Sequence, residues 1–221
     1  MTSIGSVLLE VPDPSAAEAF YTAAFGLGDR LGFRASEAPT TGFRGFTLSL
    51  VVSQPSTVDS LIGRALDGGA TVLKPVAKSF WGYGGGVQAP DGAIWTVATS
   101  SKKDTGPVDR DVDAMVLLLG VADVRASKRF YVERGLAVAK GFGSKYVEFD
   151  LPGSPVTLAL YGRRAAARNA GVSPEGTGSH RILIAGDAGP FTDPDGFAWV
   201  DAEARETDHA AGGWSQAPPI R

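Results

Sequence analysis

The sequence contains no cysteine and only two histidines among its 221 residues. The lack of thiols excludes disulfides, a cysteine nucleophile and cysteine-ligated metal centres. With so few histidines, neither a Ser-His-Asp nor a Cys-His catalytic arrangement can be assembled convincingly. The formal net charge is −3. The chain therefore lacks the basic excess typical of nucleic-acid-binding proteins, and we expect no nucleic-acid partner.

Long hydrophobic segments are also missing. The longest apolar run, near 115–122, is far too short to cross a bilayer. Residues 1–15 have neither a cationic start nor a long apolar core, so we expect no secretion signal. We therefore expect a cytoplasmic protein with no membrane partner. The length suits one large domain or two of ordinary size.

Two parts of the chain repeat the same short words in the same order. Asp13 lies seven residues before a Phe-Tyr pair, and Asp123 lies seven residues before another. The segments 90–95 and 194–199 both follow the pattern Pro-Asp-Gly-x-x-Trp. We interpret this recurrence as a two-fold internal repeat.

Each repeat opens with a predicted strand followed by a helix. Apolar runs of strand length precede Asp13 and Asp123. A carboxylate in this place accepts the free N–H groups of a first helical turn, so both aspartates are predicted N-caps. The helices are predicted over 14–24 and 126–134. We expect their Phe-Tyr pairs to pack on a sheet, with direct ligand contact as the alternative.

The remaining elements differ between the halves. In the first half, a helix is predicted over 56–67 and a hairpin with a Pro-Asp-Gly turn over 87–98. In the second half, three consecutive strands precede a short helical connector over 163–171. The helix over 56–67 has no counterpart there. The predicted fold class is α+β.

The repeat also suggests domain boundaries. We predict one domain over 1–104 and a second over 112–205. A polar linker over 105–111 joins them, and a flexible C-terminal tail follows over 206–221.

The combined pattern is specific enough to resemble a known family. Five short motifs follow one another in each half: Val-x-Asp, Phe-Tyr, Gly-Leu, Gly-x-His/Arg and Pro-Asp-Gly-x-x-Trp. This order resembles the glyoxalase/bleomycin-resistance/extradiol-dioxygenase family, the vicinal oxygen chelate superfamily, over about residues 4–203. The resemblance implies tandem βαβββ modules with curved mixed sheets enclosing a cavity. It therefore implies two tandem glyoxalase-like domains, each an incomplete pair of modules.

Enzymes of this family hold one divalent metal through three strand positions, which the resemblance carries over residue by residue. They are Ser6, Arg44 and Thr96 in the first half, and Val116, His180 and Val200 in the second. Valine has no donor atom and arginine repels a cation, so only His180 is a ligand of the expected type. We predict no metal and no cofactor. A rescue site from Glu10 and His180 is one alternative, and a divalent metal is expected only if the protein is a metal-dependent enzyme with displaced ligands.

The segment 78–86 is the most aromatic candidate for a ligand site. It carries Phe80, Trp81 and Tyr83 before three consecutive glycines. In the family this loop borders the cavity mouth, so the resemblance implies that its aromatic faces meet a planar ligand. The alternative is that these side chains pack on the sheet or on the partner domain.

Alternation along the strands supplies further wall candidates, because residues two positions apart share a face. The predicted ligand-binding set is Arg44, Phe46, Trp81, Tyr83, Glu10, Ser6, Thr96 and His180. The predicted apolar wall is Leu8, Leu48, Ile94, Leu118, Ile182 and Ile184. A buried Arg44 needs a partner, which is either Glu10 or an anionic ligand, unless the side chain reaches solvent. His180 is expected to form structural hydrogen bonds, with ligand contact or metal binding as alternatives.

These features favour a small-molecule-binding protein of drug-sequestering or ligand-sensing type that lacks the family's metal. Its ligand is expected to be aromatic or anionic. The alternative is a metal-dependent lyase, isomerase or dioxygenase of the same superfamily with displaced ligands. A structural module with a collapsed cavity is a third hypothesis. The sequence leaves open whether the two halves share one cavity, whether the protein forms a homodimer and whether catalytic activity remains.

Overall fold

The computed structural model describes residues 2–80 and 82–202. Trp81 and the predicted tail over 206–221 therefore lie outside the described residues. The helices are α1 (Pro14–Ala24), α2 (Pro55–Asp67), α3 (Val124–Glu133) and α4 (Arg163–Ala170), with a short 3₁₀ turn at Gly28–Arg30. In the described part of the chain, no helix is long and apolar enough to cross a membrane.

Within residues 2–80 and 82–104, the first half contributes seven strands. They are β1 (Ile4–Val11), β2 (Leu31–Ala35), β3 (Thr40–Gly42), β4 (Phe46–Val51), β5 (Thr71–Ser79), β6 (Gly82–Gln88) and β7 (Ile94–Thr99). As far as residue 202, where the described part ends, the second half contributes eight, of which several are short. They are β8 (Ala114–Val121), β9 (Ala137–Phe142), β10 (Tyr146–Asp150), β11 (Val156–Gly162), β12 (Gly176–Gly178), β13 (Ile182–Gly186), β14 (Phe191–Thr192) and β15 (Ala198–Asp201).

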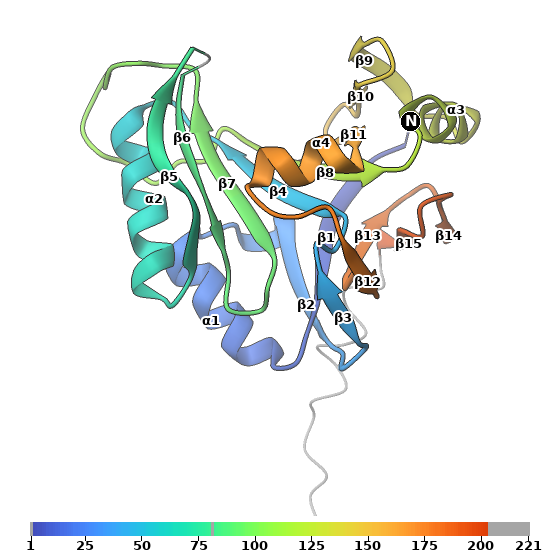
Figure 1. Cartoon of the computed structure of the whole chain (residues 1–221), viewed down its shortest axis with the longest axis horizontal. Coiled ribbons are helices and arrows are strands. Elements are labelled where there is room, and N and C mark those ends of the chain that lie inside the picture. Colours follow the sequence, from blue (N-terminus) through green and yellow to red (C-terminus); the bar gives the residue numbers. More distant parts are fainter. Residues whose placement is uncertain (1, 81, 203–221) are drawn as a thin grey trace, which may run out of the picture.

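Both large sheets contain strands from both halves. The five-stranded sheet has the order β14-β15-β13-β1-β2, and the eight-stranded sheet has the order β5-β6-β7-β4-β8-β11-β10-β9. A small two-stranded sheet, β12-β3, pairs the segment before β13 with the segment before β4. Figure 1 shows the curved sheets with α1, α2 and α3 at the outside. The predicted α+β fold of strand–helix–strand modules is confirmed, whereas the boundaries at 104 and 112 remain predictions.

The repeated helix starts follow the predicted capping chemistry. The Asp13 carboxylate accepts from the N–H of Ala16, and the Asp123 carboxylate accepts from the N–H groups of Arg125 and Ala126. Gly26 and Gly135 follow the two helices with φ values of 61° and 88°, a region where glycine has no steric cost.

The main core lies between the helices and one face of each sheet. The Phe-Tyr pairs pack there as predicted, with Tyr21 and Tyr131 only 2% and 0% exposed. Each tyrosine hydroxyl donates to an aspartate and accepts from a tryptophan, Trp95 for Tyr21 and Trp199 for Tyr131. Burial raises the pKa of both tyrosines, so both hydroxyls stay protonated.

Residues 78–79 and 82–86 of the predicted loop belong to strands β5 and β6. The glycines of this segment serve close strand pairing. A Cβ on Gly85 would lie 2.8 Å from Cγ2 of Val76 in β5, and one on Gly84 would lie 2.8 Å from the carbonyl oxygen of Val97 in β7. Because β5 and β6 pair through register shifts, only residues without side chains fit at these points.

Candidate functional site

The face of the eight-stranded sheet opposite the main core carries a row of small side chains. Strand pairing joins Thr157 to Val116, Val116 to Ser49, and Ser49 to Thr96. Their sequence neighbours, such as Leu48, point to the main core on the other face. We call these four residues the open row, because each is partly exposed.

The five-stranded sheet carries an equivalent row on its own face opposite the main core. Ser6 pairs with Ala185, and Ala185 pairs with Val200. We call these three residues the closed row, because Ser6 and Ala185 are 2% and 0% exposed. Leu8 and Leu183 extend it into a small apolar cluster.

Three metal positions were predicted in each half, and the two rows show that the second of the three was assigned to the wrong residue. Ser49 and Ala185 lie between the outer positions, where Arg44 and His180 were expected. The internal repeat relates Ser49 to Ala185 by 136 positions, as it relates Arg44 to His180. The structure therefore brings Val116 and Thr96 together through Ser49.

Backbone conformation explains the difference. Gly45, just before β4, has a φ of 88°, and Arg181, just before β13, has a φ of 52°. A left-handed residue interrupts the two-residue alternation, so positions 44 and 180 cannot be counted onto the same face as the strand. The expected cavity-facing placement was consequently wrong for four residues, which lie in the main core: Phe46, Leu48, Ile182 and Ile184.

Arg44 and His180 each fasten a Pro-Asp-Gly segment. The Arg44 guanidinium donates to the backbone carbonyl of Asp91, and His180 Nε2 lies 3.0 Å from the backbone carbonyl of Asp195. His180 Nδ1 lies 2.5 Å from the carbonyl oxygen of Arg44, and its ring stacks on Phe197 at a centroid distance of 4.0 Å. These contacts support the structural hydrogen-bonding interpretation of His180.

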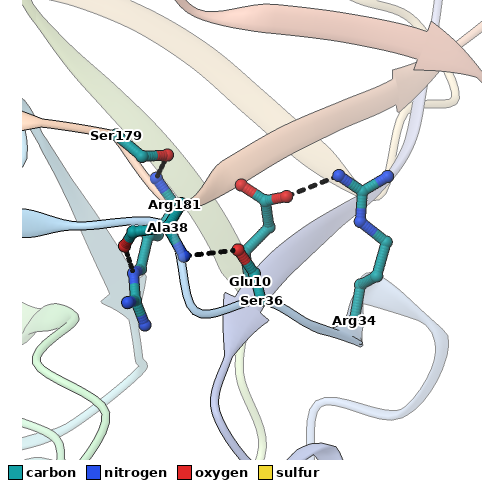
Figure 2. A network of polar contacts seen from close by, with 6 residues as sticks. All are labelled: Glu10, Arg34, Ser36, Ala38, Ser179 and Arg181. Carbon is teal, nitrogen blue, oxygen red and sulfur yellow. Dashed lines mark hydrogen bonds and ion pairs between the residues drawn. The ribbon is translucent and has the colours of Figure 1, made fainter.

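Glu10 pairs with a different arginine from the one expected. Parallel pairing of β1 with β2 sets Glu10 opposite Arg34, and Glu10 Oε1 lies 2.5 Å from a guanidinium nitrogen of Arg34. Figure 2 shows the carboxylate pointing to Arg34, while the Arg181 guanidinium lies on the other side and donates to the carbonyl of Ala38. The predicted Glu10–Arg44 pair is therefore wrong.

Tyr83 also lies away from the candidate cavity. Its hydroxyl donates to Asp59 of α2 over 2.8 Å, and this hydrogen bond raises the pKa of Tyr83. The side chain packs against the main core, which agrees with the alternative of packing on the sheet.

The open row offers hydrogen-bonding groups at a surface that solvent reaches. Ser49 Oγ and Thr96 Oγ1 lie 2.6 Å apart and share a hydrogen bond. Thr157 adds a hydroxyl at the other end of the row. Such a set binds neutral polar groups through its hydroxyls and an apolar body through its methyl groups.

A group of one acidic, one basic and one tyrosine side chain lies on the neighbouring strands β10 and β9. Glu148 of β10 pairs with Ala159 of β11, two residues from Thr157. Its carboxylate accepts from the Tyr146 hydroxyl over 2.6 Å and lies 2.9 Å from Lys140 Nζ. Burial, followed by the contact with Glu148, raises the pKa of Tyr146, which keeps that hydroxyl a donor.

Helix α4 covers one end of this face. Its small residues Ala166, Ala167 and Ala170 form a cluster with Phe43 and Ile94. A Cβ on Gly120 of β8 would lie 3.3 Å from Ala166 Cβ, so the glycine permits the helix to lie close to the sheet. In Figure 1, α4 lies across β4 and β8. The helix covers one end of the face opposite the main core, which we call the concave face. The open row on that face is partly exposed.

The family's metal does not fit these residues. Among residues 2–80 and 82–202, no group of three or more His, Cys, Asp or Glu side chains lies close enough to hold a metal ion. The donors in the two rows are neutral hydroxyls, those of Ser6, Ser49, Thr96 and Thr157. Divalent ions at catalytic sites take carboxylates and imidazoles as protein ligands, so we derive no chemistry through a metal here.

Sequence analysis missed Ser49, Thr157, Tyr146 and Glu148. A signal was available, because polar residues alternate with apolar ones along 46–51, 146–150 and 156–162. The joining of separate strands into one row depends on pairing between the halves, which no single strand reveals.

No family model and no curated protein sequence matches the chain. Among solved structures, glyoxalase I from Zea mays is similar at a TM-score of 0.59 and 14% identity, over 94% of this chain and 95% of that one. A putative dioxygenase from Bacillus subtilis is similar at a TM-score of 0.51 and 12% identity, over 98% of this chain and 77% of that one. At these identities the likeness concerns the fold. The protein has the fold of the glyoxalase/bleomycin-resistance/dioxygenase superfamily, the vicinal oxygen chelate fold.

Proposed function

We propose that the protein binds a small organic molecule on the open row and does so without a metal ion. The observation that supports this most directly is the composition of the row. Three hydroxyls and one valine form a partly exposed row, two of whose members, Thr96 and Val116, stand at positions that the resemblance assigned to metal ligands.

The chemistry of the row favours a neutral ligand over an anionic one. The hydroxyls of Ser49, Thr96 and Thr157 both donate and accept, so they suit hydroxyl, carbonyl or amide groups. The nearby Lys140 already pairs with Glu148. Tyr146 lies 6.1 Å from Tyr161, centroid to centroid, and offers an aromatic wall on the same sheet. An uncharged molecule with an aromatic portion matches this set.

Sequestration or sensing follows from the same features. The open row contains no carboxylate, imidazole or amine to transfer a proton or attack a substrate. A site made of hydroxyls and apolar surface binds and orients a ligand, as a drug-sequestering or ligand-sensing protein does.

The test combines metal analysis with a ligand screen. Elemental mass spectrometry of protein purified without chelator should find far less than one divalent ion per chain. A thermal-shift screen of neutral aromatic compounds in the presence of EDTA should yield ligands that raise Tm. The Ser49→Ala/Thr96→Val variant should lose that response, because it removes two hydroxyls with little change in volume.

Ser6→Ala is the matched control, because it removes the hydroxyl of the closed row. Its response to the same ligands should equal that of the unchanged protein. Stoichiometric metal that supports turnover would overturn the proposal and favour the lyase, isomerase or dioxygenase alternative. A full ligand response in Ser49→Ala/Thr96→Val would also count against it.

A further inference from the structure

A pocket lies away from the open row, between α1 and the turn that joins β6 to β7. Its volume is about 360 Å³. Phe20 and Tyr21 of α1 form one wall, and Pro90 and Asp91 of the turn form another. Tyr21 and Asp91 meet at its base, where the hydroxyl donates to the carboxylate over 2.9 Å.

The second half shows how the same corner is closed by hydrogen bonds. Asp195 is the repeat equivalent of Asp91. Its carboxylate accepts from the N–H of Ala122 over 2.7 Å and from the Ser127 hydroxyl over 2.8 Å. These two bonds fasten the Pro-Asp-Gly turn to the start of α3.

The first half lacks both donors. The position of Ala122 is taken by Pro12, which has no N–H, and the position of Ser127 is taken by Ala17, which has no hydroxyl. Pro12 and Ala17 both line the pocket. The corner therefore stays open because the groups that close it in the other half are absent.

A third difference between the halves changes which hydrogen bonds Asp91 accepts. In the second half, Asp193 accepts from the Tyr131 hydroxyl and from the N–H of Phe197. The equivalent of Asp193 in the first half is Ala89. Asp91 takes over this role, accepting from Tyr21 and from the N–H of Ala93. Its carboxylate consequently faces the pocket with acceptor capacity left over.

The electrostatics of the pocket favour a cation. Among its lining residues, the charged groups are the carboxylates of Asp13 and Asp91. Arg44 contacts the backbone carbonyl of Asp91 without lining the pocket. The remaining walls are largely apolar, with Phe20 as the large aromatic surface. A primary ammonium group donates to carboxylates, and an aromatic body packs on a ring such as that of Phe20.

We propose that this pocket is a second binding site, which takes an organic ammonium ion with an aromatic or aliphatic body. The site is separate from the open row, so it stands or falls independently of the function proposed above. The open row suits neutral ligands, whereas this pocket selects positive charge.

The test uses 2-phenylethylammonium as the probe and the methyl signals of Ala16 and Ala17 in the full chain as the readout. Both alanines line the pocket. The ammonium compound should shift these signals saturably, whereas phenylacetate, an anion of similar size, should not. Asp91→Asn should weaken the binding about tenfold, because the amide keeps an acceptor for Tyr21 but removes the charge.

Two further variants make the result specific. Asp123→Asn removes the carboxylate that is the repeat equivalent of Asp13 and does not line the pocket, so it should leave the affinity unchanged. Pro12→Ala/Ala17→Ser/Ala89→Asp installs the second-half arrangement and should abolish the shift of the Ala16 signal, which this variant keeps. The absence of a saturable shift, an equal response to phenylacetate, or unchanged affinity in Asp91→Asn would overturn the proposal, even if the triple variant fails to fold.

Discussion

The two rows occupy equivalent places on two sheets, yet one is open and the other closed. The open row presents hydroxyls from three strands to partly exposed surface, whereas the closed row buries Ser6 and Ala185. Both rows contain residues from both halves of the chain. The repeat thus has the same strand pairing in both sheets, while Ser6 and Ala185 of the closed row are buried and the four residues of the open row are partly exposed.

The largest expected difference between the rows is their tolerance of charge. Ala185→Glu buries a carboxylate with no partner and should lower the free energy of unfolding by about 4 kcal/mol or prevent folding. Ser49→Glu places the same group on a partly exposed surface and should cost about 1 kcal/mol. Urea denaturation of both variants measures the contrast. Equal losses would show that the open row is as buried as the closed one.

The repeated tyrosine–aspartate pairs offer the next largest contrast. Asp193 is 5% exposed and accepts from Tyr131 and from two backbone N–H groups. Asp193→Ala should therefore destabilise the protein by about 3 kcal/mol, since it leaves buried donors unpaired. Asp91 accepts from Tyr21 and one N–H, and Asp91→Ala should cost about 2 kcal/mol. A larger loss in Asp91→Ala would contradict this ranking.

The two left-handed residues before β4 and β13 should respond in different ways. At Gly45 an added Cβ would lie 2.7 Å from a nitrogen of Arg163 in a backbone region that disfavours alanine, so Gly45→Ala should cost about 2 kcal/mol. Arg181→Gly relieves strain but loses the hydrogen bond to Ala38, and these effects should nearly cancel. Thermal denaturation distinguishes the two variants, and a clear loss in Arg181→Gly would refute the cancellation.

Asp187, which directly follows β13 and accepts hydrogen bonds from Ser3, should produce the smallest effect. Hydrogen bonds from Ser3, the backbone N–H above all, hold the pKa of Asp187 below its usual value. The folded pKa is then below the unfolded one, so Asp187 stabilises the fold above the unfolded pKa and loses this contribution as pH falls through the folded value. The effect is small because Asp187 is exposed.

The control for this effect is Asp187→Asn. The difference in free energy of unfolding between the two proteins should be present at neutral pH and shrink in acid, below about pH 4. Asp193 behaves in the opposite sense, since burial raises its pKa and its ionisation disfavours the folded state as pH rises. A difference for Asp187→Asn that does not change between neutral and acidic pH would rule out this assignment.

Much of the fold followed from local sequence chemistry. Asp13 and Asp123 act as the predicted caps, and Tyr21 and Tyr131 lie in the predicted core. The helical spacing of apolar residues also located α2, which has no counterpart in the second half. These features depend on residues close together in sequence, where spacing alone carries the information.

The candidate site was harder to predict because it depends on which strands pair and on the sign of the backbone angle φ. Glu10 meets Arg34 through the register of a parallel pair, which the sequence does not specify. A positive φ is expected from a glycine, and nothing in the sequence indicates it at Arg181. Ile182 was therefore assigned to the wrong face of its strand. Ser49 became a candidate only when β7 and β8 were found on either side of β4.

The most direct test of a metal-independent ligand site is methyl NMR of threonine- and valine-labelled protein with EDTA present. Val116, Thr96 and Thr157 of the open row all carry methyl groups, and so does Val200 of the closed row. On addition of a neutral aromatic ligand from the thermal-shift screen, we expect the three open-row signals to shift together while Val200 stays unchanged. Shifts that appear only after a divalent metal is added, or that fall on Val200 instead, would contradict binding to the open row.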